Sequence, residues 1–169
     1  MRRRQKPKEA DALYGLMDPE TRLKALGIDL PTAPKPFATY RAATRAGDLV
    51  FVAGQGPTAD GKILITGRVP DTCSIDKARE AARLSVLNAL AVIKAELGSL
   101  AKVRQVVQAT VWVACADDFA DQPTVADGAT AILKELWGER GLPARAAVGT
   151  NALPRGIPVE VALTVQCEP

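Results

Sequence analysis

The chain has 169 residues, of which 47% are hydrophobic and only 4% aromatic, and its formal net charge is +3. This length fits a single domain with a core of Ala, Val and Leu, and no apolar run approaches the roughly 18 residues that a membrane-spanning helix requires. Because the sequence contains no histidine, it excludes Ser-His-Asp and Cys-His catalysis and histidine-ligated metal sites. Any chemistry therefore depends on carboxylates, Arg, Lys, Tyr, Thr, Cys, backbone groups or water.

The positive charge is confined to the N-terminal segment. Residues 1–16 hold five basic and two acidic side chains, so residues 17–169 are neutral as a whole. We expect residues 1–16 to be a flexible basic tail and residues 17–169 to be one domain. The three cysteines are far apart and form no C-x-x-C motif, so neither a disulfide framework nor a zinc site is expected. No apolar segment follows the basic residues, so we expect no signal peptide and a cytoplasmic protein.

The domain is predicted to begin with a short helix and an extended linker. Asp18-Pro19-Glu20 supplies the N-cap, the first-turn proline and the acidic residue of a helix start, and Gly27 marks its end. Pro31, Pro34 and Pro36 then favour an extended chain.

Three strands are predicted next. Phe37–Thr44 and Leu49–Ala53 are joined by a turn, and the second is apolar enough to be buried. Asp60-Gly61 predicts a hairpin turn before a short strand at Lys62–Thr66. Tyr40 falls in the first strand, where packing under the sheet and lining a pocket are both consistent with its amphipathic ring.

The second half of the chain alternates helices and longer strands. Ser74–Leu97 is apolar at helical spacing, with Ser74 as its N-cap and Gly98 after its last apolar residue. The elements predicted after it are a strand at Lys102–Cys115, a helix at Pro123–Trp137, and strands at Ala144–Asn151 and Ile157–Cys167. Since two long helices cannot cover both faces of so wide a sheet, we predict an α+β two-layer sandwich, with the helices on one face of a mixed sheet.

The helix-free face of this sheet has an unusual composition. In the last strand the file opposite the apolar residues is small and polar, and consists of Glu160, Ala162, Thr164 and Gln166. In the strand at Lys102–Cys115, the residues expected to face the helices are Val103, Val107, Val111, Val113 and Cys115. Trp112 falls in the opposite file, and a half-polar face that carries a tryptophan is typical of a surface covered by another subunit.

Two charged residues interrupt otherwise apolar strands. Arg145 lies between two alanines on the face opposite Val148, and Glu160 projects away from the apolar file of its own strand. With a connecting loop centred near Ala152-Leu153, these two become cross-strand neighbours on the helix-free face. The pair is then either an ordinary ion pair or a site in which Arg145 binds a substrate carboxylate and Glu160 holds a water or moves a proton.

Three ordered blocks of the sequence resemble the reactive intermediate deaminase (RidA/YjgF) family. Gly47–Gln55, with the sequence GDLVFVAGQ, is similar to that family's strand-Gly-Gln segment. Leu142–Val148, Leu153-Pro154 and Pro158–Val161 follow its C-terminal signature without a gap, and the resemblance spans residues 37–167.

The resemblance implies a chorismate-mutase-like sandwich that forms a homotrimer, with the sheets inward and clefts between subunits. It also implies hydrolysis of enamines and imines derived from amino acids, such as 2-aminoacrylate, to 2-oxo acids and ammonia, without a cofactor or metal. The family's carboxylate-binding Arg, water-positioning Glu and pocket Tyr fall on Arg145, Glu160 and Tyr40. Ala53, Gly54, Gln55 and Ala147 complete the expected substrate-binding residues.

The chain departs from the family pattern at two of these positions. Ala53 stands where the family often has Ser or Thr, and Ala147 stands where many members have Cys. A lost hydroxyl removes one hydrogen bond to substrate, worth about 1 kcal/mol. The departures favour a second hypothesis, a trimer that binds a small carboxylate without catalysis.

A third hypothesis is RNA cleavage or translation inhibition, the older label of the family. The neutral charge of residues 17–169 argues against it, because phosphate binding normally needs a basic surface. The partners expected are therefore further copies of the chain and a small imino or 2-oxo acid, and neither a membrane nor nucleic acid.

Overall fold

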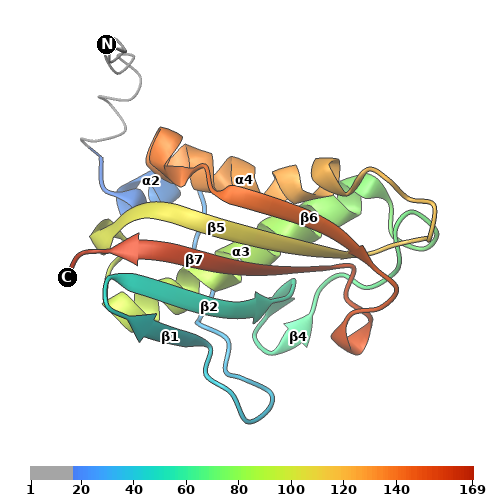
Figure 1. Ribbon diagram of the computed structural model, residues 1–169, viewed down its shortest axis with the longest axis horizontal. Helices are drawn as coiled ribbons and strands as arrows, with labels where there is room; N and C mark the ends of the chain where they lie inside the picture. The colour runs from blue at the N-terminus through green and yellow to red at the C-terminus, as the bar shows by residue number, and fades with distance from the viewer. Residues whose placement is uncertain (1–16) are drawn as a thin grey trace.

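The computed structural model describes residues 17–169, and the predicted tail at residues 1–16 lies outside them (Figure 1). The helices are α2 (Pro19–Ala25), α3 (Ile75–Leu97) and α4 (Gln122–Trp137). The strands are β1 (Ala43–Ala46), β2 (Leu49–Gln55), β3 (Thr58–Ala59), β4 (Lys62–Ile63), β5 (Val103–Ala114), β6 (Ala144–Thr150) and β7 (Val159–Cys167). No helix among the described residues is long and apolar enough to span a bilayer.

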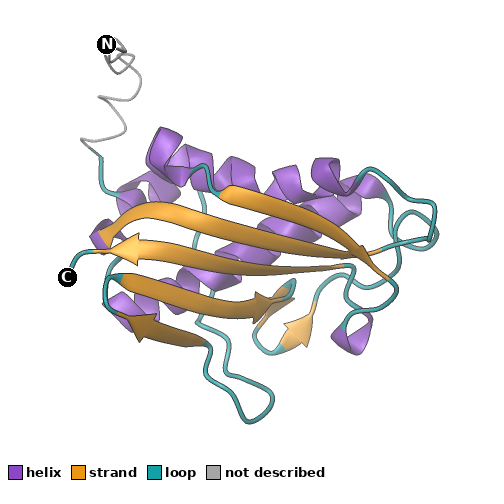
Figure 2. Ribbon diagram, in the orientation of Figure 1, coloured by secondary structure: helices purple, strands orange, loops and turns teal. Residues whose placement is uncertain are grey.

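Five strands form one sheet in the order β1-β2-β7-β5-β6, and β3 and β4 pair separately. Only β5 and β6 run parallel, and the other neighbours are antiparallel. Figure 2 shows the long helices behind one face of this sheet. The predicted α+β two-layer architecture with a mixed sheet is therefore confirmed.

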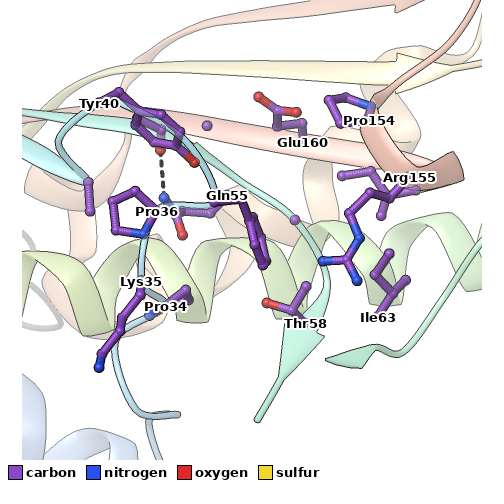
Figure 3. Close-up of a pocket in the computed structure, with 16 residues that line it drawn as sticks. Pro34, Lys35, Pro36, Tyr40, Gln55, Thr58, Ile63, Pro154, Arg155 and Glu160 are labelled. Carbon is purple, nitrogen blue, oxygen red and sulfur yellow. Dashed lines mark hydrogen bonds between the residues drawn. The ribbon is translucent and has the colours of Figure 1, made fainter. Parts of the chain in front are cut away.

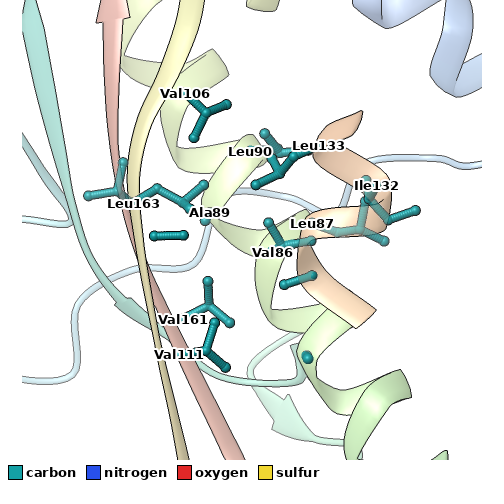
Figure 4. Packing of buried hydrophobic residues seen from close by; sticks show 14 of the residues in the cluster. Val86, Leu87, Ala89, Leu90, Val106, Val111, Ile132, Leu133, Val161 and Leu163 are labelled. Carbon is teal, nitrogen blue, oxygen red and sulfur yellow. The ribbon is translucent and has the colours of Figure 1, made fainter. Parts of the chain in front are cut away.

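The core lies between α3, α4 and the sheet. The N-cap Ser74 accepts a hydrogen bond from the backbone N–H of Lys77, and Gly98 ends α3 in the left-handed conformation with φ 83°. Leu90 and Leu163 are among the buried side chains that meet between the layers (Figure 4), where each large aliphatic group contributes about 1.5–3 kcal/mol through burial. Gly128 of α4 packs on the backbone of α3, with no room there for a side chain.

β5 contains two irregularities that the sequence did not reveal. Its register with β7 shifts between Val103 and Gln105 and again between Val106 and Gln108. Each bulge adds a residue to one strand and changes which face the following side chains occupy. Val106 is consequently buried and Val107 only half-buried, so the prediction that Val107 faces the helices is wrong.

The helix-free face has the mixed character that was predicted. All odd-numbered residues of β7 are buried, and its even-numbered residues, Glu160 included, are half-buried on the opposite face. Phe51 of β2 and Val148 of β6 are exposed on this face, at 46% and 44%.

The first predicted strand is shorter and later than expected. β1 begins at Ala43, and residues 37–40 form a bend in which the backbone N–H of Tyr40 donates to the carbonyl of Ala38 at 2.9 Å. Pairing between β1 and β2 starts at Ala43 opposite Val52, and the N–H of Ala53 donates to the carbonyl of Ala42 at 2.9 Å. Tyr40 therefore lies in a loop and not in a strand.

Candidate active site

A pocket of about 350 Å³ lies where the far end of β2, the start of β7 and the loop before β1 converge (Figure 3). Its lining includes five of the residues that the sequence assigned to the site: Tyr40, Ala53, Gly54, Gln55 and Glu160. The remaining wall comes from residues 34–37, the β3–β4 ribbon and the turn before β7. Segments distant in the sequence thus form one cavity.

Glu160 is the acidic residue of this pocket. Its carboxylate makes no hydrogen bond or ion pair with any described residue. Burial without a compensating partner raises the pKa of Glu160 above its ordinary value. The group is therefore free to accept a hydrogen bond from a ligand or water, and it is a stronger base than an exposed glutamate.

The backbone of β2 fits closely around this carboxylate. A Cβ built on Gly54 would overlap Oε1 of Glu160, so position 54 admits only glycine without displacing the carboxylate. The next residue, Gln55, is buried, and its Nε2 donates to the carbonyl of Ala53 at 3.0 Å. The strand-Gly-Gln block thus shapes the pocket with its backbone.

Arg145 does not lie beside Glu160 in the chain, and the predicted cross-strand pairing is wrong. Arg145 pairs with Ala109 and faces α4, where its guanidinium donates to Asp127 at 2.7 Å and to Thr130 at 3.0 Å. Glu160 pairs with Trp112 on the opposite face.

The physical reason is strand order. The prediction treated β6 and β7 as neighbours because they are consecutive in sequence, whereas β5 lies between them. Ala147 shares the helix-facing side of β6 with Arg145 and packs against the core. Neither residue lines the pocket of its own chain.

The sequence did not single out Arg155, which lines the pocket from the turn Pro154–Gly156. Its guanidinium lies 4.8 Å from the ring centroid of Phe37, another lining residue. Leu153-Pro154 and Gly156 signal a turn, but no sequence pattern predicts where the side chain of Arg155 points. Among residues 17–169, no three His, Cys, Asp or Glu side chains gather as a metal site would require.

Residues 20–163 match the protein family described as "YjgF/chorismate_mutase-like, putative endoribonuclease". The chain belongs to this YjgF family. A YjgF-family protein was expected from the three sequence blocks, and this expectation is confirmed.

Similar proteins with known names or structures carry different descriptions. Protein TCP17 of Trypanosoma cruzi is 35% identical over 145 residues, which is 85% of this chain and 91% of that protein. A 2-iminobutanoate/2-iminopropanoate deaminase of Dermatophagoides farinae is 30% identical over 142 residues, covering 83% and 95%. The crystal structure of a protein of unknown function from Agrobacterium tumefaciens superposes with a TM-score of 0.82 at 39% identity, covering 89% and 93%.

Proposed function

We propose that this YjgF-family protein hydrolyses imines and enamines derived from amino acids, releasing 2-oxo acids and ammonia. The observation that carries the proposal is Glu160, an unpaired, half-buried carboxylate with a raised pKa inside a pocket. Support also comes from the similarity to a mite protein named as a deaminase of this kind, at 30% identity.

The chemistry needs one base and a well-placed water. Glu160 accepts a proton from a water molecule, whose oxygen attacks the electrophilic carbon of the protonated imine. The nitrogen of the resulting carbinolamine takes this proton from Glu160. The carbon–nitrogen bond then breaks and ammonia leaves, while Glu160 accepts the hydroxyl proton as the carbonyl forms and passes it to the departing ammonia or to water. A carboxylate whose pKa is raised by burial is a stronger base for this transfer, which typically contributes about 10²–10⁴ in rate. Exclusion of bulk water and positioning of the imine add to it.

The proposal includes a homotrimer in which Arg145 of the partner subunit reaches this pocket and binds the substrate carboxylate. Arg145 lies on the sheet-edge strand β6 and pairs with Asp127, whose side chain is 59% exposed. The Arg145 side chain is 23% exposed, and because the Asp127 half of the pair faces solvent, a carboxylate ligand can take the place of Asp127 on the guanidinium. The exposed Phe51 and Val148 give the helix-free face apolar contacts for another subunit.

We also propose that the protein is cytoplasmic.

Turnover of a freshly generated imine tests this proposal. An amino acid oxidase acting on alanine supplies 2-iminopropanoate, and release of ammonia is followed with and without the protein. We expect acceleration over buffer, a loss of about 10²–10⁴ in Glu160→Gln, and a large rise of KM in Arg145→Ala. No acceleration by the wild-type protein, or full activity in Glu160→Gln, would overturn the proposal.

Two further measurements separate the other hypotheses. If 2-oxo acids raise the melting temperature but no imine is hydrolysed, the protein is a non-catalytic carboxylate-binding module. If the protein cleaves RNA at a rate that Glu160→Gln abolishes while imines are untouched, the pocket serves the endoribonuclease activity that the family description names.

A further inference from the structure

Arg155 is placed in the pocket by an unusual backbone conformation. Its φ and ψ are 58° and 19°, in the left-handed region, and Gly156 follows with φ 72°. A non-glycine residue in this region costs about 1–2 kcal/mol. The turn Pro154–Gly156 thereby directs the arginine side chain over the ring of Phe37, and Figure 3 shows its guanidinium just above Thr58 and Ile63.

The guanidinium of Arg155 lies over an aromatic ring and has no acidic partner. Its carbon is 4.8 Å from the centroid of Phe37, within the range of a cation–π contact. None of the ion pairs among residues 17–169 involves Arg155, and no described residue accepts a hydrogen bond from it. Its planar set of N–H donors is therefore available to a ligand.

Among the charged residues that line the pocket, Arg155 is the cation whose side chain faces the cavity. Lys35 also lines the pocket, but Figure 3 shows its amino group directed away from Glu160. Glu160 lies deeper, beside Gly54, and makes no ion pair with Arg155. The cavity therefore has a basic group at one side and a potential proton acceptor at another.

A substrate with a single carboxylate has no anionic group left for Arg155 to bind. In the proposed trimer, Arg145 of the partner subunit binds the carboxylate next to the imine carbon. A pocket of about 350 Å³ is within the range of ligand sites and is larger than a three-carbon imino acid fills. Resting on that proposed function, we propose that Arg155 binds a second anionic group, so that the protein prefers imines of dicarboxylic amino acids.

A matched pair of substrates tests the preference. The imines of glutamate and of norvaline have side chains of the same length, and only the first carries a second carboxylate. Both are generated by amino acid oxidases, and kcat/KM is measured for each. Because Arg155 is exposed and an exposed ion pair contributes only modestly, we expect the glutamate imine to be favoured roughly 2- to 5-fold.

The variants are chosen to keep the turn folded. Arg155→Asn removes the charge with a residue that tolerates the left-handed conformation, and Arg155→Lys keeps the charge without the planar fork. We expect the ratio of the two kcat/KM values to fall toward one in Arg155→Asn and to be intermediate in Arg155→Lys. Arg79→Gln, an exposed arginine of α3 far from the pocket lining, controls for the loss of one positive charge. A wild-type ratio near one, or an equal loss for both imines in Arg155→Asn, would overturn the proposal.

Binding of product analogues separates this inference from the proposed function. Calorimetry compares 2-oxoglutarate with 2-oxopentanoate on the wild-type protein and on Arg155→Asn. Tighter binding of 2-oxoglutarate that depends on Arg155 supports the second anion site even if no imine is hydrolysed. Turnover of imines without any such difference in binding or kcat/KM leaves the deaminase proposal intact and overturns the role of Arg155.

Discussion

Gly54 lies so close to Glu160 that any side chain at position 54 would occupy the space of the Glu160 carboxylate. One residue belongs to β2 and the other to β7, which are hydrogen-bonded neighbours in the sheet. The irregular register between Val52 and Gln55 creates the contact, because it turns the backbone of Gly54 toward the pocket. The glycine of the family block is thus explained by the carboxylate that it accommodates.

Gly54→Ala is expected to lower activity by displacing this carboxylate. A misplacement of about 1 Å can cost roughly 100-fold in rate, so we expect kcat for imine hydrolysis to fall by about that factor. Gly56→Ala adds a Cβ to the same pocket wall and is the matched comparison, because that Cβ would meet the flexible Cδ1 of Ile157 at 2.7 Å and not the Glu160 carboxylate. Equal activities of the two variants would show that the fit around Glu160 is unimportant.

The stability of Glu160→Gln should differ from that of the wild type in a pH-dependent way. Burial raises the pKa of Glu160, so the folded protein retains this proton at pH values where the unfolded chain has lost it. As pH rises from the ordinary glutamate value through the raised pKa, the wild type loses stability that the neutral glutamine keeps. We expect the melting temperature of Glu160→Gln, relative to that of the wild type, to increase as pH rises through this window. Above the raised pKa the difference should stay constant. A difference that is flat with pH, or largest in acid, would contradict the burial of an unpaired carboxylate.

Ala53→Ser should increase affinity for substrate. Ala53 lines the pocket, at a position where the family pattern often has the hydroxyl of Ser or Thr. A new hydrogen bond worth about 1 kcal/mol corresponds to roughly a fivefold gain in kcat/KM. Ala59→Ser, in the separate β3–β4 ribbon and outside this pocket's lining, is the control. An unchanged or lower kcat/KM in Ala53→Ser would show that the substrate offers no partner at this wall.

Gly128→Ala should destabilise the fold, against the usual effect of this substitution in a helix. Replacing glycine with alanine in a helix interior normally stabilises by about 1 kcal/mol. Here the added Cβ would collide with the carbonyl group of Arg79 in α3. We expect a net loss of about 1–3 kcal/mol in the free energy of unfolding, measured with urea, because the helices must separate. The exposed Lys134→Ala in the same helix should change it by less than about 0.5 kcal/mol, and a stabilised Gly128→Ala would contradict the close helix contact.

Sedimentation equilibrium tests the proposed assembly. A trimer has three times the chain mass of 17.9 kDa, and Val148→Asp on the helix-free face should dissociate it by placing a charge in the apolar contact. Leu64→Asp is the control, since Leu64 is 51% exposed, slightly more than Val148, but lies outside the five-stranded sheet. If the wild-type protein is a monomer, the proposed cleft between subunits does not exist.

The sequence predicted those parts of the fold that local patterns determine. α3 runs from the residue after its Ser74 cap to the residue before Gly98, since the capping residue and the apolar spacing both act within a few residues. β7 alternates as predicted because the extra residues of the bulges lie in its neighbours β5 and β2, so β7 itself keeps the two-residue period. The bulges of β5 depend on its contacts with β7, and they account for the error at Val107. The strand assigned to Tyr40 is replaced by a bend at residues 37–40.

The site was predicted only in part for the same reason. Tyr40, Ala53, Gly54, Gln55 and Glu160 line one pocket as the family resemblance implied, and all but Tyr40 lie in the sequence blocks that carry it. The relation of Arg145 to Glu160 depended on which strands are neighbours, and the position of β5 between β6 and β7 is a long-range arrangement that sequence spacing does not determine. The placement of Arg155 in the pocket depends on a left-handed backbone conformation and on the direction of its side chain, and neither follows from residue type.

The central claim is that the Glu160 carboxylate acts as the base for water in this pocket. Its most direct test is kcat/KM for imine hydrolysis as a function of pH, expressed as the ratio of wild type to Glu160→Gln, because the ratio removes the ionisation of the substrate itself. The account predicts a ratio that rises with pH through an apparent pKa above that of an ordinary glutamate and reaches about 10²–10⁴. A ratio that stays near one at every pH would contradict it.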